Sequence, residues 1–248
     1  MFENPKLRLG ATLWLAAMAG AVVLSLTVIP QLLAKAPQTV PLGVAVAASV
    51  VQTGVLLALA VWAGVALSRP LGLGAPAIEA ALSGADAWRP LKRQLIPAAV
   101  VGMFVGGVLI LLARIAPAEL LALGQTVEIP VAAKLLYGGV TEEMLMRWGL
   151  MTALIWLPWR FIQKRAGLPR TSYVVGAIIV AALLFGVLHL PAAAAMGVSL
   201  TPSVVSYVVI GNAVPGVLFG ILYWRYGLEA AILAHALGHV VAVLAAVA

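Results

Sequence analysis

Long apolar runs occupy most of this sequence, and few charged residues separate them. Hydrophobic residues make up 64% of the 248 positions and charged residues 9%, against about 25% charged in a typical soluble domain. Inside a lipid bilayer, only helices and closed barrels satisfy their own backbone hydrogen bonds. The runs are continuous and lack the alternation of barrel strands, so they predict helices. We therefore expect an all-α fold, a polytopic transmembrane helical bundle.

Seven apolar segments are long enough to span a bilayer, and no second domain or internal repeat is evident between them. The stretch 192–200 is apolar enough to re-enter the membrane, so we expect seven to eight helices. We treat residues 1–248 as a single integral membrane domain. The seven segments cover about 10–33, 41–67, 96–113, 131–157, 172–190, 203–224 and 228–247.

The positive charges lie mainly in the connections between the apolar runs. With the N-terminus placed in the cytoplasm, 11 of the 15 Lys and Arg residues fall in cytoplasmic connections. Lys35, Arg114 and Lys134 fall on the other side, and Arg147 lies within a run. Since positive charge marks cytoplasmic loops, we expect a cytoplasmic N-terminus. The formal net charge of +7 then suits anionic membrane lipid, and no nucleic-acid partner is expected.

Three ionisable side chains, Glu142, Glu143 and Arg147, lie inside the fourth apolar segment. Each charge near the bilayer centre costs about 2.5–3.5 kcal/mol on insertion scales, so such groups are usually kept for function. Residues four apart share a helix face, which predicts an ion pair between Glu143 and Arg147. Glu142 is rotated by about 100° from Glu143 and points elsewhere. We expect Glu142 to act as a general base; the alternative is that both glutamates only hold helices together.

All three histidines, His189, His235 and His239, lie in apolar segments of the C-terminal quarter. Intramembrane ionisable groups face the bundle interior and pair with one another, so these histidines and the two glutamates are expected to converge on one cavity. The spacing of His235 and His239 would suit a metal pair. No glutamate follows His235, however, so the segment is not a His-Glu-x-x-His zinc helix.

Several other hydrolytic chemistries lack their residues. An aspartyl dyad needs two aspartates, and Asp86 is the only one. No Gly-x-Ser-x-Gly element is present for a serine nucleophile. The absence of cysteine excludes disulfides, thiol nucleophiles and thiolate metal ligands. Glutamate, histidine and arginine remain as the groups that can carry chemistry.

These residues form a pattern that resembles the CPBP intramembrane proteases, a family that includes CAAX prenyl endopeptidases, bacteriocin-processing proteins and abortive-infection proteins. Glu142-Glu143-x-x-x-Arg147 resembles the first motif of this family, and Phe185-x-x-x-His189 the second. His235, which follows Gly216-x-x-x-Gly220, resembles the third. The likeness covers residues 130–248 as a protease core, whereas 1–129 are less characteristic N-terminal helices.

The resemblance implies roles for individual residues. Glu142 is expected to activate water with His189 beside it, Glu143 and Arg147 to be the supporting pair, and His235 to stabilise the oxyanion. Four residues after this histidine the family typically has Asn or Asp, and here His239 stands in that place. A neutral imidazole still donates one hydrogen bond. No cofactor is expected; the alternative is a divalent metal such as zinc held by Glu142, His189 and His235.

The sequence as a whole predicts an endopeptidase that cleaves a peptide or protein substrate within or near the bilayer, with a water-accessible cavity open toward the cytoplasm. The resemblance includes prenylated, CAAX-type substrates. Two alternatives use the same residues: a proton-coupled transporter, and a non-catalytic immunity or scaffold protein in the membrane. Cleavage that depends on Glu142 would distinguish the protease from both.

Overall fold

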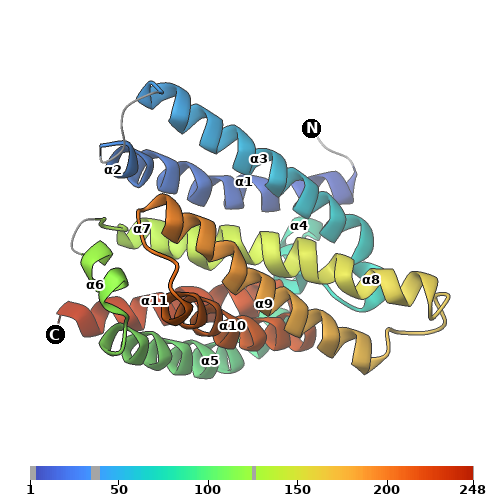
Figure 1. Ribbon diagram of the computed structural model, residues 1–248. Helices are drawn as coiled ribbons and strands as arrows, with labels where there is room; N and C mark the ends of the chain where they lie inside the picture. The colour runs from blue at the N-terminus through green and yellow to red at the C-terminus, as the bar shows by residue number, and fades with distance from the viewer. Residues whose placement is uncertain (1–3, 35–39, 125–126, 248) are drawn as a thin grey trace.

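A computed structural model describes residues 4–34, 40–124 and 127–247 of the chain, and within these ranges it contains helices and no strand (Figure 1). This confirms the all-α bundle. Six helices are long and apolar enough to cross a membrane in the described part of the chain. They are α1 with α2 (Pro5–Thr27 and Ile29–Leu33), α3 (Leu42–Leu67), α5 (Trp88–Arg114), α9 (Thr171–Ala195), α10 (Pro202–Tyr226) and α11 (Leu228–Val247).

A seventh helical segment carries the two adjacent glutamates. It runs without a break through α7 (Val131–Ala133), η2 (Lys134–Glu142), η3 (Met144–Met151) and α8 (Thr152–Phe161). Both η2 and η3 are π-helical, with wider turns than an α-helix. We call this segment the glutamate helix. It lies alongside the other long helices in Figure 1, in addition to the six candidate spans.

Residues 192–200 do not form the re-entrant segment that the sequence allowed. Instead α9 continues through Pro191 to Ala195, because the alanines that follow the proline favour a helix. The chain then turns at Gly197, which has a φ of 84°, and enters α10 at Pro202. The longer α9 moves His189 away from the helix end.

The two ends of the bundle differ in charge. The N-terminus, α4 (Pro76–Ser83) and the end of α8 lie at one end, whereas α2, α6 (Ala118–Gly124) and the C-terminus lie at the other (Figure 1). We call the first the basic end and the second the opposite end. Lys35 lies outside the described residues. The basic end carries Lys6, Arg8, Arg69, Arg89, Lys92, Arg93, Arg160, Lys164, Arg165, Arg170 and Arg225.

Glycines allow two close helix contacts that shape the site. A Cβ atom at Gly139 would lie 3.0 Å from the Cβ of Ala236, so α11 packs directly on the backbone of η2. A Cβ atom at Gly216 would lie 3.1 Å from that of Ala182, and Gly220 packs similarly against α9. Small residues four apart permit such approach between membrane helices. The first contact sets α11 against the glutamate helix, and the contacts at Gly216 and Gly220 set α10 against α9.

Glu229 is a buried carboxylate that the sequence did not point to. It is 7% exposed and accepts hydrogen bonds of 2.8 Å from the backbone N–H groups of Ala77 and Ile78, at the start of α4. Gln94 of α5 donates to its second oxygen at 3.4 Å. This carboxylate therefore fixes the first turn of α11, two turns before His235.

Candidate active site

Four side chains that the sequence singled out line one cavity of about 410 Å³. They are Glu142 on η2, His189 on α9, and His235 and His239 on α11. The Glu142 carboxylate lies 3.8 Å from His189 Nε2 and 3.9 Å from His235 Nε2. Three helices thus bring one carboxylate and three imidazoles together, as expected from the cost of isolated polar groups in a membrane.

The carboxylate of Glu142 has no close partner in this cluster. Its distances to the two imidazoles exceed the range of a direct hydrogen bond, which ends near 3.2 Å for N–H···O. The side chain is 17% exposed, whereas that of Glu143 is fully buried. Glu142 therefore has accepting capacity left for a molecule in the cavity.

Hydrogen bonds on the far side of each ring orient the imidazoles of His189 and His235. His189 Nδ1 lies 2.7 Å from the carbonyl oxygen of Phe185, which can only accept, so Nδ1 carries the proton. His235 Nδ1 lies 2.8 Å from Glu143 Oε1 and donates to it when that carboxylate is ionised. Both Nε2 atoms are left facing Glu142. The side chains of Phe185 and His189 also meet edge to face, with their ring centres 4.7 Å apart.

Glu143 and Arg147 form the ion pair that helical spacing predicts. Arg147 Nη1 lies 3.1 Å from Glu143 Oε1, and both side chains are almost completely buried. The same oxygen accepts from His235, and Arg147 Nη2 donates to the Gly216 carbonyl at 2.9 Å. We call Glu143, Arg147, His235 and Gly216 the buried network. It joins the glutamate helix to α10 and α11.

Two phenylalanines enclose the buried network. The guanidinium carbon of Arg147 lies 5.2 Å from the ring centre of Phe185 and 5.4 Å from that of Phe219, within cation–π distance. Phe219 also stacks on His235 at 4.6 Å between ring centres. Sequence reasoning missed Phe219, because one aromatic residue in an apolar helix gives no signal of its neighbours.

His239 occupies the wall of the cavity beside His235. Their rings stack with centres 5.0 Å apart. A Cβ atom at Gly138 would lie 2.7 Å from His239 Nε2, so a larger residue there would require this imidazole to shift. His239 therefore packs against Gly138, which lies about one helical turn before Glu142 on η2.

Further polar groups line the cavity that the sequence did not single out for the site, among them Lys134, Tyr137 and Asn212. Asn212 Nδ2 donates to the Val208 carbonyl at 2.8 Å. Pro215 has no N–H, so the carbonyl of Gly211 lacks its usual helical donor, and both residues line the cavity.

The three residues of the zinc alternative lie on the wall of the same cavity. Among the described residues, no group of three or more His, Cys, Asp or Glu side chains is arranged to hold a metal ion. Glu142, His189 and His235 are near one another, and the Nδ1 hydrogen bonds leave Nε2 of both imidazoles facing Glu142. Metal-binding histidines are commonly oriented in the same way, so chelation and metal analysis are the test of the zinc alternative.

The cavity lies in the half of the bundle away from the basic end. Its lining runs from the cluster to Leu32 of α2, Ile129 before the glutamate helix, and Met196 after α9. All three belong to the opposite end, with α2 and α6 (Figure 1). The expectation that the cavity opens on the same side as the N-terminus is therefore wrong. The segment expected at 172–190 ended directly after His189, whereas α9 continues to Ala195. The depth of His189 in the bundle could therefore not be predicted from the sequence.

A membrane-embedded bundle with a carboxylate and imidazoles around an internal cavity has the parts of an intramembrane hydrolase. Residues 125–241, just under half of the chain, match the family model described as type II CAAX prenyl endopeptidase Rce1-like. The matched region contains all three motifs, and it supports their resemblance to the CPBP family of intramembrane proteases. Comparisons with curated proteins and with solved structures gave no match.

The two glutamates should differ in their effect on stability. Glu143→Gln removes the only carboxylate that faces Arg147 in the buried network, and breaking a buried ion pair costs about 3–5 kcal/mol. Glu142→Gln leaves that network intact and should change stability little. Thermal unfolding of the purified proteins in detergent measures both. Equal losses in the two variants would contradict the division of roles.

Proposed function

We propose that this protein is an endopeptidase that hydrolyses a membrane-associated peptide with water activated by Glu142. One observation carries the proposal: Glu142 is the accessible carboxylate of an adjacent pair, and two oriented imidazoles face it across the cavity. Its neighbour Glu143 is held by Arg147 and His235 and has no route to the cavity. A general base needs such a free, positioned carboxylate.

The proposed reaction begins with a water molecule between Glu142 and His189. This water donates one hydrogen to the Glu142 carboxylate and the other to the Nε2 lone pair of His189. As Glu142 takes the proton, the water oxygen bonds to the carbonyl carbon of the scissile peptide, and the C=O electron pair moves to the oxygen. Collapse re-forms C=O and breaks the C–N bond, while Glu142 returns the proton to the leaving nitrogen.

His235 and His239 are the proposed donors to the tetrahedral oxyanion. Because His235 Nδ1 faces Glu143, its Nε2 is the nitrogen available to the cavity. In this role His235 carries both ring protons, and the two cations Arg147 and His235 face the two carboxylates of Glu143 and Glu142. His239 donates from a neutral ring in the position where the family typically has Asn or Asp. Preorganised donors of this kind are a major source of rate acceleration.

The cavity favours an apolar peptide substrate. Most of its lining is aliphatic or aromatic, from α1, α2, α5, α9 and α10, and the polar groups gather near Glu142. Such a lining accommodates a hydrophobic side chain or a lipid-modified residue, which includes the prenylated substrates that the family name describes. Neither the transporter nor the scaffold alternative has a specific observation in its favour.

Replacing Glu142 should abolish cleavage while the protein remains folded. General-base catalysis contributes about 100- to 10,000-fold, so Glu142→Gln should slow hydrolysis by at least about 100-fold. The measurement uses purified protein and fluorescence-quenched peptides with an apolar tail, one prenylated and one acylated. Glu128→Gln, at an exposed position away from the cluster, is the matched control and should cleave normally. Undiminished cleavage by Glu142→Gln would refute the mechanism.

The oxyanion role makes a separate prediction for His239. An amide donates a hydrogen bond as a neutral imidazole does, so His239→Asn should keep most of the activity. His239→Leu fills similar space without a donor and should lower kcat about 100- to 1,000-fold. Single-turnover cleavage separates this effect from substrate binding. If both variants cleave equally well, His239 is not a donor to the oxyanion.

We also propose that the activity needs no bound metal. Chelator-treated protein should then cleave at the untreated rate, and elemental analysis should find far less than one metal ion per chain. The zinc alternative predicts loss of cleavage after chelation and recovery on adding zinc. Glu142→Gln is the background control, because chelation should not alter a variant that lacks the base.

A further inference from the structure

The charges at the two ends of the bundle indicate how it lies in the membrane. Eleven Lys and Arg residues lie at the basic end, whereas Arg114 and Lys134 are the cations of the opposite end in the described residues. The acidic residues Glu119 and Glu128 balance these two. Because Lys and Arg accumulate in cytoplasmic connections, the basic end faces the cytoplasm.

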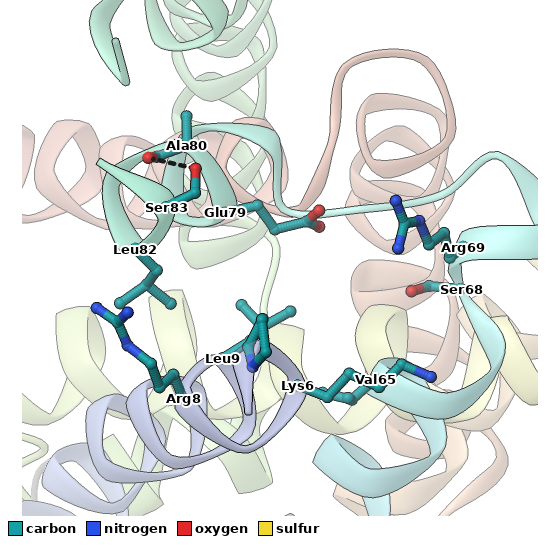
Figure 2. A pocket seen from close by; sticks show the side chains of 11 residues that line it. Lys6, Arg8, Leu9, Val65, Ser68, Arg69, Glu79, Ala80, Leu82 and Ser83 are labelled. Carbon is teal, nitrogen blue, oxygen red and sulfur yellow. Dashed lines mark hydrogen bonds between the residues drawn. The ribbon is translucent and has the colours of Figure 1, made fainter. Parts of the chain in front are cut away.

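A pocket at the basic end supports the same orientation. It has a volume of about 510 Å³ and is bordered by Lys6 and Arg8 of α1, Arg69 after α3, and Glu79 of α4. Figure 2 shows Arg69 and Glu79 reaching into it from different segments. Glu79 is partly engaged, since its Oε1 accepts the Ala75 N–H at 2.9 Å. Three cations around a concave surface suit the anionic lipid headgroups of a cytoplasmic leaflet.

The catalytic cavity extends toward the other face of the membrane. His189 lies six residues before the end of α9 at Ala195, about 9 Å along a helix that rises 1.5 Å per residue. Leu32, Ile129 and Met196 continue the lining to the opposite end. No residue of the loop 162–170 or of α4 lines it.

We infer that the catalytic cavity opens on the non-cytoplasmic side of the membrane. The substrate class that follows is a membrane-anchored or exported peptide whose scissile bond lies in the outer half of the bilayer or beyond it. A peptide that stays in the cytoplasm reaches only the basic end, which has no path of lining residues to Glu142. This substrate class rests on the proposed function; the orientation does not.

The absence of cysteine makes the orientation directly measurable. Ser83→Cys at the basic end and Ser199→Cys at the opposite end are matched substitutions at exposed serines. Intact spheroplasts are treated with a membrane-impermeant methanethiosulfonate, and thiols that escape it are then detected with a maleimide polymer after lysis. We expect Ser199→Cys to react in intact spheroplasts and Ser83→Cys only after permeabilisation. Protection of Ser199→Cys, or reaction of both residues, overturns the inference.

A second measurement tests the substrate class separately. Ser199→Cys protein is reconstituted into vesicles, and the fraction with the opposite end outward is counted by the same labelling. The quenched peptide is added outside only. Its cleavage should be proportional to that fraction, whereas cleavage proportional to the inward fraction overturns the inference. If detergent-solubilised protein also fails to cleave, the proposed function fails while the labelling result still decides the orientation.

Discussion

The buried ion pair between Glu143 and Arg147 is the interaction on which the rest of this structure depends. Neither group tolerates a lipid environment alone, so each fixes its surroundings. Glu143 also holds His235 on α11, and Arg147 holds the Gly216 carbonyl on α10 at 2.9 Å. The pair therefore sets the positions of three helices around the cavity. Arg147 and His235 both bind Glu143, so its neighbour Glu142 is left without a close partner.

Much of the architecture follows from hydropathy and helical spacing. Lipid excludes irregular backbone, so apolar runs predict the long helices closely; the segment expected at 41–67 is α3 at Leu42–Leu67. The four-residue spacing of Glu143 and Arg147 predicts their ion pair. The scarcity of polar groups predicts that the histidines meet Glu142. In each case an unpaired polar or charged group in lipid is so costly that only the paired arrangement is stable.

Other features depend on packing that no local pattern encodes. The π-helical turns of η2 and η3 are one such feature, and α11 packs on the backbone of η2 at Gly138 and Gly139. Contacts between distant residues, such as Phe219 on His235, need the helix order in space. The burial of Glu229 depends on the N–H groups of Ala77 and Ile78 in α4, which lie 152 and 151 residues earlier in the chain. No motif links the two segments. Predicting the side on which the cavity opens likewise depends on the true length of α9, which ends at Ala195.

The central claim is that Glu142 activates water and never bonds covalently to the substrate. Single-turnover cleavage in water enriched in oxygen-18, followed by mass spectrometry of the product and of the peptide containing Glu142, tests it most directly. The account predicts one heavy oxygen in the new carboxylate of the product and none in Glu142. Heavy oxygen in the Glu142 carboxylate, with an unlabelled product, would show a covalent intermediate and contradict it.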